Sequence, residues 1–151
     1  MPSFDPVPNL QIKRLHPEAI LPAYQSEHAA GMDLHACLED EVTLQPGDIA
    51  MIPCGFAMAV PVGYEAQIRP RSGLASRNGI SMPNAPGTID ADYRGEVIVP
   101  VINLGKESFT FKHGLRFAQM VISPVAHVEI KEVKTLDSTI RGEKGFGSTG
   151  A

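Results

Sequence analysis

Apolar and polar residues alternate along most of the chain and predict many short strands. Residues 64–68 alternate most strictly, and shorter runs of the same kind follow at intervals of about 8–12 residues, with turn-forming residues between them. Strands are expected at residues 10–15, 29–37, 41–44, 49–52, 56–60, 64–68, 97–102, 109–111, 117–122 and 125–133. Because no amphipathic helices separate these runs, the pattern indicates an all-β sandwich, jelly roll or barrel.

One segment departs from this period. After Ser72, the residues up to Asn78 favour a helix of about two turns, and Asn78-Gly79 is a stop signal. Ser72 suits the N-cap of this helix. Pro100 interrupts the apolar run 97–102, which predicts an edge or a bulge in that strand.

Polar residues gather between glycines in the segment 86–96, just ahead of that apolar run. Asp90, Asp92, Tyr93 and Arg94 lie there, so the segment is expected to be a hairpin that leads into a buried strand. Loops held by a rigid sheet often carry function, and a carboxylate such as Asp90 is a candidate to activate a water. The alternative is a surface turn with solvated charges.

Composition narrows the class of protein. The 151 residues fit one domain, and the net charge of -4 argues against broad binding to nucleic acid or a membrane surface. Cys37 and Cys54 are too few for a disulfide framework, so reduced thiols and a cytoplasmic location are expected. No signal peptide or membrane span is predicted.

The composition changes after Leu136, and the tail offers almost nothing to bury. Residues 145–150 match Gly-x-Gly-x-x-Gly, but a dinucleotide-binding motif must open a helix, and none can follow here. Exposed amides, the basic Arg141 and Lys144, and Phe146 would suit phosphates and a flat ring. The alternative is a disordered polar tail.

Two further segments have chemistry suited to phosphate. In Arg71-Ser72-Gly73, a helix start offers free amides next to a hydroxyl and a guanidinium, although a plain N-cap fits equally well. Gln119 lies in an apolar strand and needs a partner for its amide, either a ligand or neighbouring backbone. Asp33 beside Gly31 suggests a turn-capping aspartate more than a neighbour of a metal.

Taken together, five segments resemble the trimeric deoxyuridine triphosphatase (dUTPase) family, in that family's order. They are 30–34 (AGMDL), 70–75 (PRSGLA), 87–96 (GTIDADYRGE), 116–120 (RFAQM) and 141–150 (RGEKGFGSTG). Phe117, Met120 and Lys144 are small departures that remove no chemically required group.

The resemblance implies hydrolysis of dUTP to dUMP and pyrophosphate by attack of water on the α-phosphate. Such a dUTP diphosphatase limits uracil incorporation into DNA and supplies dUMP for thymidylate synthesis. Asp90 would be the catalytic base that orients or deprotonates the water. The implied substrate-binding residues are Arg71, Ser72, Gly73, Asn84, Gly87, Thr88, Ile89, Tyr93, Ile98, Gln119, Arg141, Phe146, Gly147, Ser148 and Thr149.

Each group would have its own task by the same resemblance. The segment from Asn84 to Tyr93 would hold the nucleoside, with Tyr93 excluding a 2′-hydroxyl. Phe146 would lie on the uracil, and the rest of the tail would close over the phosphates. Mg²⁺ is the expected cofactor, and Asp33 would touch it only through a water.

The resemblance also implies a jelly-roll-like β barrel (β-clip) with one short helix and a flexible glycine-rich C-terminal tail. The barrel domain is expected at 1–136 and a mobile arm at 137–151, which would close over a neighbouring subunit's active site. The expected partners are dUTP and two further copies of the chain in a homotrimer with shared sites, without nucleic acid or membrane. A dCTP deaminase and a non-catalytic nucleotide-binding protein on the same fold are the alternatives.

Overall fold

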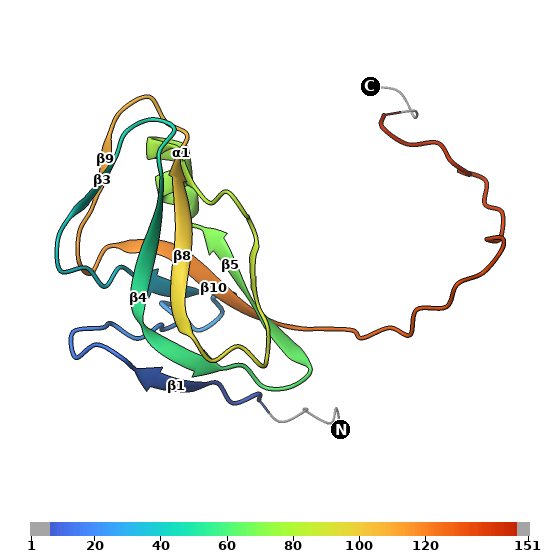
Figure 1. The fold of residues 1–151 in the computed structure, drawn as a ribbon, viewed down its shortest axis with the longest axis horizontal. Coiled ribbons are helices and arrows are strands. Elements are labelled where there is room, and N and C mark those ends of the chain that lie inside the picture. The colour runs from blue at the N-terminus through green and yellow to red at the C-terminus, as the bar shows by residue number, and fades with distance from the viewer. Residues whose placement is uncertain (1–6, 148–151) are drawn as a thin grey trace.

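Two four-stranded sheets form the body of the protein in the computed structural model, which describes residues 7–147 (Figure 1). The first sheet has the order β1-β4-β8-β6, the second β2-β10-β5-β7, and β3 pairs with β9 at one end. The strands are β1 (Gln11–Arg14), β2 (Met32–His35), β3 (Val42–Leu44), β4 (Ile49–Ala59), β5 (Tyr64–Pro70), β6 (Ile80–Ser81), β7 (Gly87–Ile89), β8 (Glu96–Asn103), β9 (Phe109–Phe111) and β10 (Arg116–Pro124). The predicted all-β class is confirmed.

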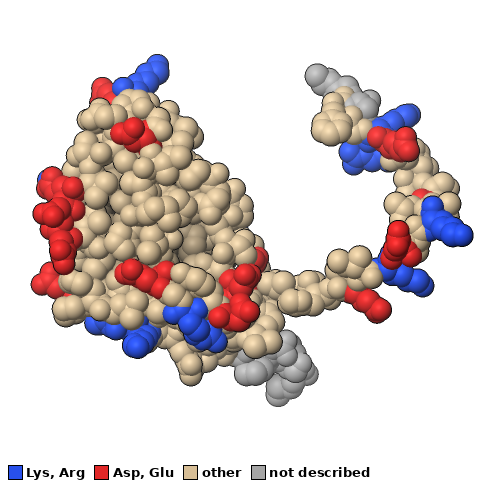
Figure 2. All heavy atoms as spheres, viewed as in Figure 1, with Lys and Arg blue, Asp and Glu red and all other residues tan. Residues whose placement is uncertain are grey.

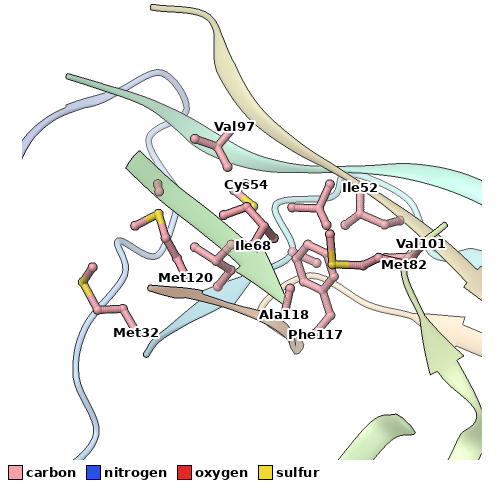
Figure 3. Packing of buried hydrophobic residues seen from close by; sticks show 14 of the residues in the cluster. Met32, Ile52, Cys54, Ile68, Met82, Val97, Val101, Phe117, Ala118 and Met120 are labelled. Atoms are coloured by element: carbon pink, nitrogen blue, oxygen red, sulfur yellow. The ribbon is translucent and has the colours of Figure 1, made fainter. Parts of the chain in front are cut away.

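The inward-facing side chains of the two sheets form one core (Figure 3). In β8 the residues Val97, Val99 and Val101 are buried, whereas Ile98 between them is exposed. Phe111 packs edge-on against Phe117, with their ring centroids 6.1 Å apart. The strand expected at residues 97–102 is therefore confirmed, and the structure shows that one of its two faces is buried. Such burial is the main stabilising term of the fold.

The outer face of β4 and β8 is also apolar. The ladder pairs Ile49 with Ile102, Met51 with Pro100 and Pro53 with Ile98, so these six side chains share one face. Ile49 and Met51 are 58% and 61% exposed. Figure 2, in the same view as Figure 1, has an uncharged centre over β4 and β8, with acidic and basic groups around its rim. An apolar face of this kind is typical of an interaction surface.

Three expectations about strands are corrected. Residues 49–52 and 56–60 belong to the single strand β4, because Gly55 takes the left-handed conformation (φ +76°) and absorbs a register shift between Pro53 and Ala57. Segment 86–96 is not a hairpin. Strand β7 pairs with β5, and β8 pairs with β4 and β6, so this segment crosses from one sheet to the other.

The third correction concerns residues 125–133, where a last strand was expected. The described chain is irregular from Val125 onward, and Val128 and Ile130 are 78% and 92% exposed. Figure 1 shows the segment beyond β10 as an extended tail that leaves the body. The apolar alternation is there, but no strand of the described chain pairs with it. The division into a domain at 1–136 and an arm at 137–151 stays a prediction.

Candidate active site

A small pocket lies where β7 leaves one sheet and β8 enters the other. We call it the β7–β8 pocket; it has a volume of about 180 Å³ and is lined by Thr88, Ile89, Asp90, Tyr93, Glu96, Val97 and Ile98. An adjoining hollow of about 70 Å³ shares Thr88, Ile89 and Ile98 and adds Asn84 and Gly87. The structure therefore brings together all seven sequence-predicted residues of segment 84–98.

Asp90 follows directly after β7 and is exposed at the wall of the pocket. Among the described residues, its carboxylate makes no hydrogen bond or ion pair, whereas its backbone carbonyl accepts a 3.2 Å hydrogen bond from the amide of Tyr93. The turn is thus fixed through its backbone, and the carboxylate is left available for a ligand or a water.

The side chains of Arg94 and Glu96 stabilise the shape of this segment. Arg94 Nη1 donates to the carbonyls of Ala91 and Tyr93 at 2.7 and 2.9 Å. Glu96 Oε1 accepts from the amide of Gly55 at 3.2 Å, which ties the start of β8 to the irregular part of β4. These side chains hold the loop around the pocket.

A second group of functional side chains lies where β2, β10 and the end of β5 meet. We call Asp33, Arg71 and Arg116 the arginine cluster. Asp33 Oδ1 is 3.3 Å from Arg71 Nε, and Asp33 Oδ2 is 3.3 Å from Arg116 Nη1. Arg71 Nη1 also donates to the backbone carbonyl of Arg116 at 2.9 Å. Asp33 is therefore a paired strand residue and does not cap a turn.

Gln119 lies beside the arginine cluster on β10. Its Nε2 donates to the carbonyl of Pro70 at 2.9 Å, so the backbone partner proposed as one alternative is confirmed. Its Oε1 rests against Gly31, where a Cβ would come within 2.6 Å of that oxygen. The side chain thus links β10 to the residue that precedes Arg71, and Gly31 leaves room for it.

The helix α1 (Ser72–Asn78) begins directly after Arg71. Its N-cap is Arg71, without a side-chain cap, so the assignment of Ser72 to that position is wrong; Ser72 is the first helical residue. The predicted stop is confirmed, since Gly79 is the left-handed C-cap at φ 70°. The segment Arg71-Ser72-Gly73 therefore joins the arginine cluster to the start of α1.

His35 is the remaining titratable group near Asp33. It faces Arg116 across the ladder between β2 and β10. Burial lowers its pKa, Asp33 raises it, and the charges of Arg116 and Arg71 lower it further. The net pKa falls below its ordinary value, so the ring is neutral at pH 7 and adds no charge to the cluster.

The predicted residues of the tail lie apart from both groups. Arg141 donates through Nε to the carbonyl of Lys144 at 2.9 Å, and the Phe146 ring is fully exposed. Gly147 has a left-handed backbone (φ +81°), and Ser148 and Thr149 lie outside the described residues. Within one chain, then, the tail as far as Gly147 contacts neither the β7–β8 pocket nor the arginine cluster.

Sequence reasoning missed the role of Arg116. Arg116 stands beside the predicted Gln119, but its pairing with Asp33 depends on the register of β2 against β10, which no local pattern reveals. Among residues 7–147, no group of three or more His, Cys, Asp or Glu side chains is arranged to hold a metal. No described helix is long and apolar enough to cross a membrane.

The two groups have different chemistry. The β7–β8 pocket combines apolar side chains, Ile89, Val97 and Ile98, with polar groups and suits a flat polar ring, whereas the arginine cluster suits an anion. One ligand with both parts is a nucleotide, so the fold and its polar groups define a nucleotide-binding β protein.

Comparison with known proteins agrees with that class, and the chain belongs to the dUTPase family. The model of that family matches residues 17–150. The deoxyuridine 5'-triphosphate nucleotidohydrolase of Syntrophotalea carbinolica is 55% identical over 141 residues, which are 93% of this chain and 96% of that protein. The protein of the same name from Desulfotalea psychrophila is 58% identical over 130 residues, covering 86% and 87%.

Solved structures support the fold. The dUTPase of Staphylococcus bacteriophage 80alpha with dUpNHpp has a TM-score of 0.86 and 29% identity, over 95% of this chain and 99% of that chain. A variant dUTPase from phage phi11 of S. aureus, described with a structural Mg(II) ion, has a TM-score of 0.77 at 24% identity, over 84% and 97%. The jelly-roll-like fold expected from the resemblance is confirmed.

Proposed function

We propose that this chain is a dUTP diphosphatase that hydrolyses dUTP to dUMP and pyrophosphate. Membership of the dUTPase family sets the reaction class. The observation that carries the proposal is the Asp90 carboxylate, which has no partner among residues 7–147 and lies at the wall of a pocket that suits a nucleoside. A carboxylate in that position can act on water, whereas one engaged in ion pairs cannot do so as freely.

Asp90 orients the attacking water and accepts its proton as the water oxygen bonds to the α-phosphorus. The bond between that phosphorus and the oxygen bridging to the β-phosphate breaks, and pyrophosphate leaves with the electron pair. General-base assistance of this kind contributes about 10²–10⁴-fold to the rate. The water oxygen becomes an oxygen of the phosphate of dUMP, and the proton that Asp90 accepts is afterwards released to solvent.

Recognition of the base rests on the free edge of β7. Because β7 ends its sheet, one side of Gly87-Thr88-Ile89 pairs with β5, and the outward backbone groups are available to a ligand. Backbone donors and acceptors at fixed spacing suit the edge of uracil, with Asn84 alongside. Tyr93 stands at the sugar position and leaves no room for a 2′-hydroxyl.

Phosphate binding is assigned to Arg71, Ser72, Gly73 and Gln119. Arg71 is held by Nε on Asp33 and by Nη1 on the carbonyl of Arg116, which orients its Nη2 without requiring the substrate. Preorganised donors of this kind lower the cost of binding. Phe146 then covers the base, and Arg141, Gly147, Ser148 and Thr149 close over the phosphates.

A homotrimer would bring the β7–β8 pocket of one chain close to the arginine cluster and the tail of its neighbours. The exposed apolar face of β4 and β8 continues into the β7–β8 pocket, because Ile98 belongs to both. A neighbouring copy packed on that face would border the pocket directly. The exposed Val128 and Ile130 of the extended segment also fit packing on another copy.

Magnesium is proposed as the cofactor. When bound, it would neutralise part of the charge on the triphosphate, and Mg²⁺ favours phosphate oxygens and waters over an all-protein cage. The residues fit this arrangement, because a carboxylate offers about four acceptor positions and Asp33 can accept a metal-bound water besides its two arginines.

The deciding experiment is pyrophosphate release from dUTP, dCTP, dTTP and UTP, with Mg²⁺ present. We expect release from dUTP in large excess over the other three. Release of ammonia from dCTP would identify a deaminase instead, and binding of dUTP without any release would identify a non-catalytic protein.

A further inference from the structure

Gly95 is the residue against which Tyr93 rests. A Cβ built on Gly95 would lie 2.4 Å from Tyr93 Oη and 2.6 Å from Cζ, both far below any real carbon contact. Tyr93 Oη also donates to the carbonyl of Glu96 at 3.0 Å. The hydroxyl end of the ring therefore rests against Gly95, with its hydroxyl bound one residue further on.

That arrangement fixes a wall of the β7–β8 pocket. Tyr93 lines the pocket together with residues of β7 and β8, and the carbonyl that accepts from its hydroxyl belongs to Glu96 of β8, whose side chain accepts from the amide of Gly55. At its other end, the backbone amide of Tyr93 is bonded to Asp90. Tyr93 is thus held at its backbone amide and at its hydroxyl, and the lack of a side chain at Gly95 allows the ring to approach the backbone closely.

The requirement at Gly95 concerns space and not backbone conformation. Gly95 is exposed and does not take the left-handed conformation, so alanine would introduce no backbone strain there. Tyr93 is 46% exposed, so its ring can move without disturbing the core. A methyl group at this position would therefore displace the tyrosine while the fold stays intact.

We propose that Gly95 is a positioning residue for sugar discrimination: it lets Tyr93 lie close to the backbone, where the ring excludes a ribose 2′-hydroxyl. The proposal rests on the proposed function, because it assumes that the pocket holds the deoxyribose. It deepens that function by assigning the discrimination to a pair of residues and not to Tyr93 alone.

The test is Gly95→Ala, with kcat/KM measured for dUTP and UTP. We expect the dUTP-to-UTP ratio to fall by at least about tenfold, within the range by which small steric changes in a pocket alter selectivity. Dissociation constants for dUpNHpp and its ribose counterpart, measured by calorimetry, give the same ratio even if turnover is lost. Thermal unfolding should match that of the parent protein.

A double-mutant cycle separates positioning from a general structural effect. In a Tyr93→Ala background, Gly95→Ala should have no further effect on the ratio, because the ring through which it acts is gone. A ratio within about twofold of the parent in Gly95→Ala, or an additive loss in the double variant, would overturn the proposal. If the parent protein released no pyrophosphate from dUTP, the proposed function itself would fail.

Discussion

The β7–β8 pocket and the arginine cluster hold their charged groups in opposite ways. In the arginine cluster, the Asp33 side chain is 13% exposed and pairs with both arginines, so each side chain has a partner before any ligand arrives, while one net positive charge remains for an anion. In the pocket, Asp90 is exposed and its carboxylate has no partner among the described residues. Groups that only hold a ligand can be preorganised by one another, whereas a group that must take a proton from water has to remain unpaired.

The largest effect is expected from removing the tail after Leu136. This truncation should abolish pyrophosphate release and leave the trimer folded, because the described tail buries no residue in the core. Size-exclusion chromatography and thermal unfolding check the fold. Lys134→Ala, just ahead of the cut, is the control and should keep full activity. Unfolding of the truncated chain would contradict its role as a lid.

Asp90→Asn tests the unpaired carboxylate itself. We expect kcat to fall by about 10²–10⁴-fold while KM changes little, because the amide keeps the size of the side chain but cannot accept the proton. Steady-state kinetics with dUTP measure both constants. Asp92→Asn is the matched control: this carboxylate is two residues away and lines a different hollow, with Val62 and His127. Near-normal turnover in Asp90→Asn would rule out Asp90 as the general base.

Asp33→Asn tests the preorganised side of the comparison. Loss of the charge weakens the hold on Arg71 and Arg116, so KM should rise about tenfold, equivalent to about 1.4 kcal/mol, with a smaller change in kcat. The melting temperature should shift little, since partly exposed ion pairs contribute about 0–1 kcal/mol. Glu41→Gln breaks the exposed pair with Lys112 and should leave KM unchanged. An unchanged KM in Asp33→Asn would show that Asp33 does not position Arg71 and Arg116 for the substrate.

The smallest effect is expected for Gly31→Ala. The added methyl displaces Gln119 Oε1 and should raise KM by about two- to tenfold, without changing kcat. Since the change acts through Gln119, it should add nothing in a Gln119→Ala background. A loss of kcat instead would show that Gly31 influences the reacting groups.

Local apolar patterning was enough to predict most strands. The pattern failed at residues 125–133. Alternation indicates that a segment could form an amphipathic strand, but a strand also needs a neighbouring strand to pair with, and the described chain provides no such neighbour there. It also failed at Pro53 to Gly55, where a left-handed glycine lets one strand continue through an irregularity.

The candidate site also has one part that local sequence helped to predict and one part that it did not. In segment 84–98 the local pattern singled out Asp90, and the other predicted residues followed from the resemblance to the family. The arginine cluster joins residues far apart in sequence, and its geometry follows from which strands are neighbours. Ser72 shows a further limit: its type suits an N-cap, but the chain starts the helix one residue earlier.

The extended tail has a consequence for the speed of the proposed closure over the substrate. Its attachment is firm, since the amide of Val125 donates to the carbonyl of Gly63 at 2.9 Å. The roughly 20 residues from there to Phe146 span about 70 Å when extended, about twice the diameter of a body of this size. Phe146 is therefore a tethered group whose local concentration, on the order of millimolar, is set by chain length and not by the amount of protein. Dilution that leaves the trimer assembled should not slow the closing step.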